Sequence, residues 1–285
     1  MKKICKTIFI AAVLLCMCTV TAFADIGSKP RVTIKLKNPP QEVFYTDLLY
    51  RPEYPDRLHE NIDADEEYNL DMLQLLLSYT DDGWYPAYTA GTYIPMWGNL
   101  IADEDNKVVY SYHGVPDSFK VIIVTESGKV KTTDIIHRQA MEINLTLDCK
   151  DMSYTTKPVW QVYLGQFMLT CSVTLLVEGL ILLLFGFKLK ENLKVFLLTN
   201  IFTQVVFSAA FASAFIYGGT MGSMMAFIPL EVAVTLTELL IYRKLLKGHN
   251  EKIRIIYAVA ANIITAGLTW VNMDALMDFM FKLMR

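Results

Sequence analysis

Histidine is scarce in this sequence, and the histidine-containing motifs of metal sites and nucleophilic catalysis are missing. Only four of the 285 residues are histidines. His59, His113 and His137 lack the spacing of metal ligands, and no Ser/His/Asp or Cys/His motif is recognisable. His249 lies in a loop, so zinc peptidases of the His-Glu-x-x-His type and prenyl-protease-like intramembrane enzymes both lack their membrane histidines. The sequence supports no enzyme activity and predicts neither a metal site nor a cofactor.

Cysteine is also rare and unsuited to a disulfide framework. Three of the five cysteines, Cys5, Cys16 and Cys18, belong to the N-terminal segment 1–24. Cys149 and Cys171 remain, one in a polar region and the other in a long apolar segment. A bond between them is not expected, because the two sit in different media.

No basic run is interleaved with aromatic residues, so nucleic acid is not expected as a partner. Charge is instead separated along the chain. Residues 25–158 hold 13 Lys or Arg and 22 Asp or Glu, a net charge of −9, although the whole chain carries only −3. Two short segments, 188–194 and 243–254, hold eight basic and two acidic residues. The sequence therefore predicts two unlike halves.

The N-terminal segment 1–24 has the features of a secretory signal peptide. Lys2, Lys3 and Lys6 precede an apolar run that ends in Ala22-Phe23-Ala24, the small-x-small pattern of a signal-peptidase site. We expect cleavage before Asp25. The alternative is an uncleaved anchor helix, which the short apolar core disfavours.

Residues 25–158 are predicted to form an extracytoplasmic, β-sandwich-like domain. Segments 31–37 and 141–147 alternate apolar and polar residues as half-buried strands do. Further β-branched and aromatic strands are expected in 43–50, 107–113 and 119–136, the last with a turn at Ser127-Gly128. One helix over 66–79, capped by Asp65, interrupts the strands.

A dense group of aromatic residues between 84 and 97 is the candidate binding site of this half. Exposed aromatic rings of this density bind sugars or peptides, whereas buried ones fill a core, which is the commoner role. Both interpretations stay open for Trp84, Tyr85, Tyr88, Tyr93 and Trp97.

Residues 159–285 are predicted to form a bundle of four transmembrane helices. Four apolar segments, near 159–187, 195–217, 221–242 and 255–273, are each long enough to cross about 30 Å of hydrocarbon. The basic segments fall between the first and second and between the third and fourth. By the positive-inside rule both lie in the cytoplasm, and the C-terminus ends outside.

Polar residues inside these segments form a candidate intramembrane seam. Glu178 interrupts "VTLLVEGLILLLFGF", about 15 Å from Lys188 along a helix, where a charge costs at least ~2.5–3.5 kcal/mol. We expect it to face the bundle or to be protonated. The seam would either hold the helices together through hydrogen bonds, or Glu178 and Glu231 would form a proton- or cation-responsive pair, with Glu238 nearer the cytoplasm. Tyr242 is a candidate partner of Glu238. The seam comprises Glu178, Asn200, Thr203, Gln204, Glu231, Glu238, Asn262 and Thr265.

The seam also indicates an internal repeat. "VTLLVE", a basic turn and "TNIFTQ" correspond to "VTLTE", a basic turn and "ANIITA". The interval from Glu178 to Asn200 is nearly the same as the interval from Glu238 to Asn262. Two parallel hairpins related about an axis along the membrane normal would give this pattern.

Several stretches together resemble a family. "ADIGSKP", "SFKVIIVTESGKVKTTDIIHR", "TNIFTQ" and the Glu-x6-Glu element are similar to uncharacterised multi-pass membrane proteins of Firmicutes. The resemblance implies a Gram-positive cell membrane, a signal peptide, a β-rich extracytoplasmic domain and a four-helix membrane unit. It implies no chemistry.

Two functions therefore stand as predictions. The first is an extracytoplasmic binding or sensory domain coupled to a four-helix membrane unit, in an accessory role. The second is transport of protons, cations or a small solute through the intramembrane glutamates, for which four helices would need self-association or another membrane protein. The lipid bilayer is the expected partner of either.

Overall fold

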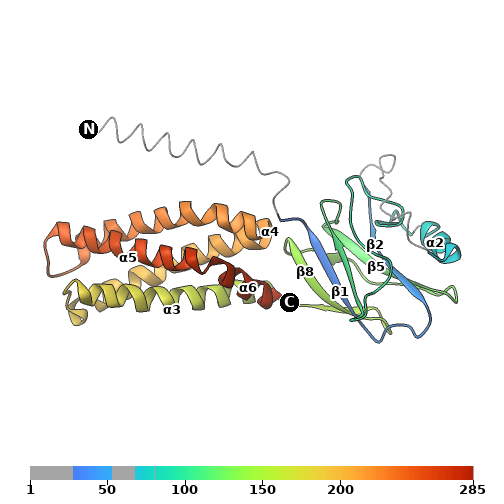
Figure 1. The fold of residues 1–285 in the computed structure, drawn as a ribbon, viewed down its shortest axis with the longest axis horizontal. Helices are drawn as coiled ribbons and strands as arrows, with labels where there is room; N and C mark the ends of the chain where they lie inside the picture. The colour runs from blue at the N-terminus through green and yellow to red at the C-terminus, as the bar shows by residue number, and fades with distance from the viewer. Residues whose placement is uncertain (1–27, 53–67, 80, 285) are drawn as a thin grey trace.

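The computed structural model describes residues 28–52, 68–79 and 81–284. The predicted cleavage before Asp25 lies outside these residues, as does the predicted helix cap Asp65. The described chain forms a two-sheet β domain followed by a helical region (Figure 1).

The first sheet has the strand order β4-β1-β8-β9, with β1 and β8 parallel and the other pairs antiparallel. Its strands are β1 (Arg31–Lys37), β4 (Lys107–Ser111), β8 (Glu142–Asp148) and β9 (Ser153–Thr156). The alternation in β1 buries Val32, Ile34 and Leu36 and leaves Arg31, Lys35 and Lys37 exposed, as the sequence predicts.

The second sheet has the order β3-β2-β5-β6, and β7 pairs with the start of β5. Its strands are β2 (Phe44–Tyr50), β3 (Tyr85–Pro86), β5 (Ser118–Thr125), β6 (Val130–Thr132) and β7 (Ile136–His137). Gly128, at a φ of 81°, makes the turn predicted between β5 and β6. The inner faces of the two sheets share one hydrophobic core.

Strand β2 is buried on both faces. The segment from Trp84 to Leu100 also pairs with its edge beyond β3, with Ala87 N donating to Leu48 O at 2.6 Å and Thr46 N to Leu100 O at 2.8 Å. Helix α2 (Leu70–Leu77) is shorter than the predicted 66–79. Its N-cap is Asn69, whose side chain accepts hydrogen bonds from Asp71 N and Met72 N.

The helical region contains three helices long and apolar enough to cross a membrane, not the four predicted. They are α3 (Trp160–Leu184), α4 (Leu189–Leu245) and α5 (Glu251–Val271). The segments predicted separately as 195–217 and 221–242 both belong to α4.

Helix α4 is broken at Gly219, whose φ of 62° and ψ of −159° lie outside the helical region. Asn200 bonds to Tyr242 and Thr203 bonds to Glu238, although these pairs are 42 and 35 residues apart. The chain must therefore reverse at Gly219, and residues 189–218 (the first arm) lie against residues 220–245 (the second arm).

Helix α6 (Met273–Met284) follows a break at Asn272 and was not predicted. Its apolar face packs on α3 at Gly165, where any side chain would collide with Leu283. A short helix that alternates charged and apolar groups has too little hydropathy to stand out beside the long segments.

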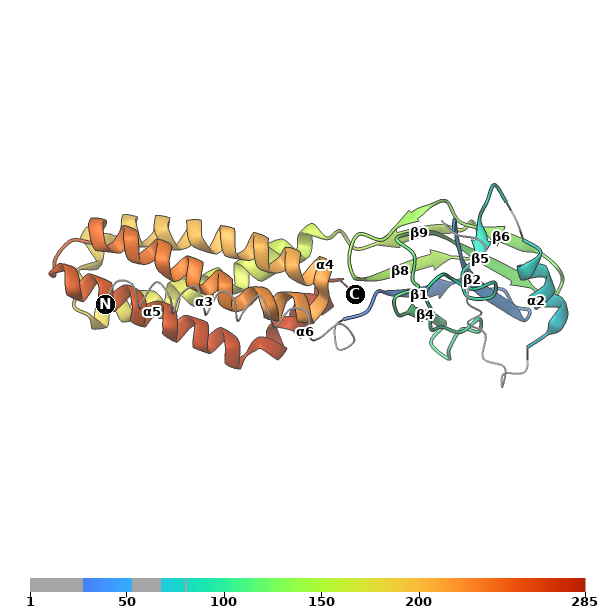
Figure 2. The same cartoon turned by 90° about the horizontal axis from the view of Figure 1, so that it is seen from above.

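The β domain and the basic turns lie at opposite ends of the molecule (Figures 1 and 2). Gly219, where the arms of α4 meet, lies against Ser28 at the β-domain end. At the other end Phe187 and His249 are in ring contact, with centroids 4.9 Å apart. We call these the β-domain end and the basic end of the helical region.

Candidate functional site

Two buried glutamates from different hairpins define the candidate site. Glu178 of α3 is 1 % exposed and Glu238 of the second arm is 0 % exposed, and their carboxyl groups are close enough to interact electrostatically. Within the described residues, neither takes part in an ion pair with Lys, Arg or His. We call Glu178 and Glu238 the carboxyl pair.

Each carboxyl group accepts a hydrogen bond from a threonine of the other hairpin. Thr203 Oγ1 in the first arm donates to Glu238 Oε1 at 2.6 Å. Thr265 Oγ1 in α5 donates to Glu178 Oε1 at 3.4 Å. The bonds are reciprocal, so the carboxyl pair locks the two hairpins to each other through hydrogen bonds of the kind that join membrane helices.

An asparagine accompanies each glutamate. Asn262 Nδ2 donates to Glu238 Oε2 at 2.8 Å. Asn200 occupies the corresponding place beside Glu178, where its Nδ2 donates to Tyr242 Oη at 2.7 Å. Both amide side chains are at most 2 % exposed. The predicted hydrogen bond between Tyr242 and Glu238 is thus replaced by one between Tyr242 and Asn200.

The equivalence of the hairpins extends to their turns, which supports the predicted repeat. Gly186 and Gly248 both adopt positive φ, 79° and 107°. Helices α4 and α5 begin three residues after these glycines. Asn200 and Asn262 each follow fourteen residues after the same glycines. Because each asparagine lies equally far from its turn, Asn200 and Asn262 lie at the same depth along the bundle.

Glu231 is not part of the carboxyl pair. It lies seven residues before Glu238 in the second arm, about 10 Å along the helix, and is only partly buried. The structure places Glu178 closest to Glu238, and Glu231, the predicted partner of Glu178, interacts with both glutamates from farther along the second arm. Both Glu178 and Glu231 interact with Glu238 electrostatically.

Gln204 extends the site along the first hairpin. Its Nε2 donates to Thr174 Oγ1 of α3 at 3.2 Å, while its Oε1 has no hydrogen-bond partner in the described part of the chain. Of the eight predicted seam residues, the structure brings seven together and leaves Glu231 apart.

Three residues of the site were not predicted from the sequence. Tyr257 packs beside Tyr242, with ring centroids 5.6 Å apart, between the carboxyl pair and the basic end. Asn192 joins the two basic turns through bonds to the backbone of Lys188 and Lys247. Gln166 is fully buried in α3. Gln166 lies four residues before Thr170, on the polar face of α3, and this spacing could have identified it as part of the site.

The aromatic segment of the β domain divides between the two predicted roles. Trp84 and Tyr88 are 4 % exposed and belong to the core, and Tyr85 is half-buried in β3. Tyr93 and Trp97 are 49 % and 63 % exposed. The first three aromatic residues therefore belong to the core or its edge. Of the five, only Tyr93 and Trp97 remain candidates for a binding surface.

Trp97 forms a small aromatic platform. Its ring stacks on Tyr112, with centroids 4.3 Å apart and planes 16° apart. A groove beside it is lined by Asn99, Lys107 and Val109. Stacked rings next to polar groups present the apolar face and hydrogen-bonding rim that sugars and peptides use.

Asp47 is a buried carboxylate in β2 that the sequence did not single out. Its oxygens accept hydrogen bonds from Leu48 N at 2.6 Å, Tyr88 N at 2.9 Å, Thr89 N at 2.8 Å and Thr89 Oγ1 at 2.6 Å. Burial raises the pKa of Asp47 to about 6, and these donors oppose the rise. Asp47 thereby fixes the aromatic segment beside β2.

The described residues contain no cluster of three or more His, Cys, Asp or Glu side chains suited to a metal ion. Comparison with protein-family models, curated proteins and solved structures found no match to this chain. The resemblance to Firmicutes membrane proteins therefore stays a prediction.

Proposed function

We propose that this chain is a multi-pass protein of the cell membrane, in which an extracytoplasmic binding or sensory domain is coupled to a four-helix membrane unit. The observation that carries the proposal is the direct structural link between the β domain and the arm that holds Asn200 and Thr203. An apolar belt, the distribution of charge and the contacts at the junction support it.

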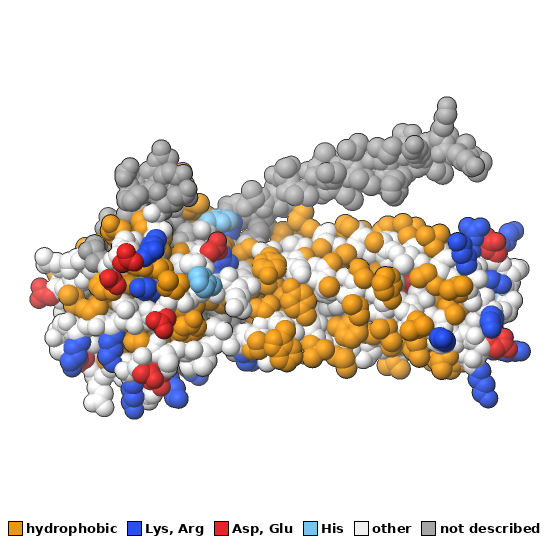
Figure 3. Space-filling model, turned by 180° about the vertical axis from the view of Figure 1, so that it is seen from behind, with side chains coloured by type: hydrophobic (Ala, Val, Ile, Leu, Met, Phe, Trp, Pro, Cys, Tyr) orange, Lys and Arg blue, Asp and Glu red, His pale blue; other side chains and the backbone are white. Residues whose placement is uncertain are grey.

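The apolar belt supports insertion in a bilayer. Hydrophobic side chains cover the helical region between the β domain and the basic end, where Lys and Arg gather (Figure 3). The arms of α4, residues 189–218 and 220–245, would measure about 45 Å and about 39 Å, so each is long enough to cross. With α3 and α5 this makes four crossings.

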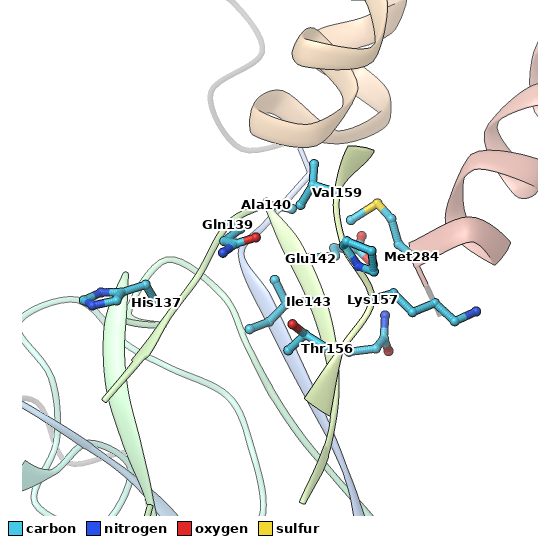
Figure 4. A pocket seen from close by; sticks show the side chains of 11 residues that line it. His137, Gln139, Ala140, Glu142, Ile143, Thr156, Lys157, Val159 and Met284 are labelled. Atoms are coloured by element: carbon cyan, nitrogen blue, oxygen red, sulfur yellow. The ribbon is translucent and has the colours of Figure 1, made fainter. Parts of the chain in front are cut away.

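The distribution of charge supports the orientation. Both basic turns lie at the basic end, and the positive-inside rule assigns that end to the cytoplasm. The β domain would then lie outside. The C-terminal helix α6 returns to the β-domain end, where Met284 meets Val159 and Ala140 (Figure 4).

Contacts at the junction support coupling between the two parts. Met141 N, just before β8, donates to Ile216 O of the first arm at 2.5 Å. Ala140 is 3 % exposed within the core of the helical region. Arg138 Nη1 donates to Ala140 O at 3.0 Å and to Met141 O at 3.3 Å, and its guanidinium also pairs with Asp117.

The junction itself is too tight to bind a ligand. The hollow between Gln139, Glu142, Lys157 and Met284 has a volume of about 40 Å³, room for very few water molecules (Figure 4). The platform of Trp97 and Tyr112 is the better candidate for the binding face. A ligand there would contact β4, which is paired with β1.

A double-mutant cycle tests the coupling. Arg138→Ala loosens the junction and Thr203→Val removes one bond to the carboxyl pair. If the parts are coupled, the two effects on unfolding of the full-length protein in detergent should depart from additivity by at least ~0.5 kcal/mol. Asn38→Ala, which removes bonds to Asp148 at the far end of β1, is the control and should be additive with Thr203→Val. Additive effects in both cycles would contradict coupling.

Cysteine labelling in intact cells tests the topology. In a background whose native cysteines are replaced by alanine, a membrane-impermeant maleimide should label Lys129→Cys in the β domain. It should label Lys190→Cys, in the basic end, only after permeabilisation. The reverse result would contradict the proposed orientation.

Transport is the second candidate function, and the buried carboxyl pair is the observation that favours it. Against a through-path, Tyr242, Tyr257 and Phe187 are at most 3 % exposed on the basic-end side of the pair. Proton flux into liposomes that Glu178→Gln abolishes without unfolding would favour transport. Absence of flux would favour the binding role.

A further inference from the structure

A column of polar side chains connects the carboxyl pair with the β-domain end. On α3 they recur every four residues before Glu178, and on the first arm every four residues after Asn200, so each set shares one helix face. The column comprises Gln166, Thr170, Thr174, Gln204 and Ser208. Nearer the β-domain end, Tyr163 Oη and Ser213 Oγ are 2.9 Å apart. From Glu178 to Tyr163 it spans about 22 Å of helix.

The column holds more polar atoms than its protein neighbours satisfy. Gln166 Oε1, Gln204 Oε1 and Ser208 Oγ have no hydrogen-bond partner among the described residues, although their side chains are only 0 %, 7 % and 3 % exposed. Polar groups buried without partners are strongly unfavourable in a lipid environment. Buried sites of this kind, with several polar atoms close together, are where proteins hold internal water.

The second hairpin shows that the fold does not require this polarity. With Glu238 aligned on Glu178, Thr170 and Thr174 correspond to Leu230 and Val234. With Asn262 aligned on Asn200, Gln204 and Ser208 correspond to Ala266 and Trp270. The corresponding positions of the second hairpin thus carry apolar side chains, and Val234 is as buried as Thr174, whereas Trp270 is 48 % exposed and Ser208 only 3 %. A packing role alone does not account for the column.

The basic end is closed by contrast. Tyr242 and Tyr257 are fully buried, and Phe187 packs between Tyr257 and His249. Asn192 holds the basic turns together, with its Oδ1 accepting from Lys247 N at 2.7 Å. Within the described chain, polar groups therefore lead from the carboxyl pair in one direction only.

We propose that the column between α3 and the first arm is a hydrated path that opens the carboxyl pair to the β-domain side alone, and that the pair binds a proton delivered along it. The proposal rests on the membrane-spanning part of the proposed function and is independent of coupling. Groups that face the pair from other elements are Glu231, Tyr242 and Tyr257. None of these supplies positive charge.

The donors around the pair favour a proton over a metal cation. Each oxygen of Glu238 accepts one hydrogen bond, from Thr203 or Asn262, so donor hydrogens already take half of its lone-pair positions and fewer are left for a cation. Glu178 Oε1 accepts the 3.4 Å bond from Thr265, and its Oε2 has no partner among the described residues. Two adjacent carboxyl groups without a countercharge cannot both ionise readily, and a proton on one relieves their repulsion.

Silver-ion modification of single cysteines tests the path. In the cysteine-free background, with the protein in proteoliposomes of known orientation, Gln204→Cys and Ser208→Cys should react with Ag⁺ added on the β-domain side. The corresponding positions Ala266→Cys and Val234→Cys in the second hairpin should react at least tenfold more slowly. Equal rates in the two hairpins, or faster reaction from the basic-end side, would overturn the path. Correct labelling at Lys129→Cys and Lys190→Cys would separate this outcome from a failure of the topology.

Infrared spectroscopy after a pH jump tests the ligand. In an Asp47→Asn background, which lacks the carboxyl group with a pKa of about 6, the band of a protonated carboxyl group should rise on acidification and be lost when Glu178→Gln is added. Its rise should slow at least tenfold in Ser208→Val and remain unchanged in Trp270→Leu. A band that Na⁺ removes at constant pH would assign the pair to a metal cation, and equal slowing in both variants would overturn the role of the column. Thermal unfolding of each variant would identify any that fail to fold.

Discussion

Asp47 and Glu178 are both buried carboxyl groups, one in the β domain and one in the helical region, but their surroundings differ. Asp47 accepts four hydrogen bonds between 2.6 and 2.9 Å, three of them from backbone N–H groups. Glu178 accepts a long side-chain bond from Thr265 and faces a second glutamate. A carboxylate with all its lone pairs engaged holds a structure together. One with spare acceptors and a like-charged neighbour is able to take up a proton.

Replacing Asp47 should have the largest effect on stability. Asp47→Ala leaves the N–H groups of Tyr88 and Thr89 buried without acceptors, and we expect a loss of about 3–5 kcal/mol. Denaturant unfolding of the full-length protein in detergent, followed through the signal of Trp84, measures it. Asp151→Ala, which removes an exposed carboxylate bonded within its own turn, is the control and should cost far less. Similar losses for both would contradict a structural role for Asp47.

The pH dependence of the unfolding free energy tests the surroundings assigned to Asp47. The pKa of Asp47 is raised from 3.8 to about 6, so the folded β domain binds the proton more tightly than the unfolded chain does. The resulting stability is fully present below pH 3.8 and is lost as pH rises through 6. The contribution should fall by about 2.4 kcal/mol between pH 4 and pH 7. The difference in unfolding free energy between wild type and Asp47→Asn across this range isolates it, and a flat difference would refute it.

The two threonines of the carboxyl pair should differ in effect. Thr203→Val removes a 2.6 Å bond to Glu238, and Thr265→Val removes a 3.4 Å bond to Glu178. We expect losses of about 1–1.5 kcal/mol for the first and less than about 0.5 kcal/mol for the second. Unfolding in detergent compares them directly. A larger loss for Thr265→Val would place the stronger bond at Glu178.

Neutralising Glu178 should have the smallest effect on stability. Glu178→Gln keeps an acceptor for Thr265 and removes the repulsion with Glu238, so unfolding should change by less than about 0.5 kcal/mol. Glu178→Leu is the comparison, because it leaves Thr265 without its carboxyl acceptor. A loss above about 2 kcal/mol in Glu178→Gln would show that the ionised carboxylate itself holds the bundle, contrary to our account.

Periodicity predicted most of the fold. The alternation in 31–37 and 141–147 indicated the places of β1 and β8, although only the structure shows that they pair in parallel. Hydropathy located the apolar segments, and the charge of 188–194 and 243–254 located the turns. Alternation and hydropathy are local properties, so a single sequence reveals them.

What the sequence did not reveal depends on contacts between distant residues. Asp47 lies within an apolar strand, and its partners Tyr88 and Thr89 come some forty residues later. Glu231 and Glu238 share a helix face, but the packing of the two hairpins against each other decides which of them pairs with Glu178. The repeat of glutamate and asparagine did indicate Glu238 as the partner of Glu178, since Glu238 occupies in its hairpin the position that Glu178 occupies in the first.

The most direct test of the account is the protonation of the two kinds of carboxyl group at pH 7, measured by infrared spectroscopy of the full-length protein in lipid. We predict a protonated-carboxyl band that Glu178→Gln removes and Asp47→Asn leaves in place. A spectrum without this band at pH 7, or a band that only Asp47→Asn removes, would contradict it.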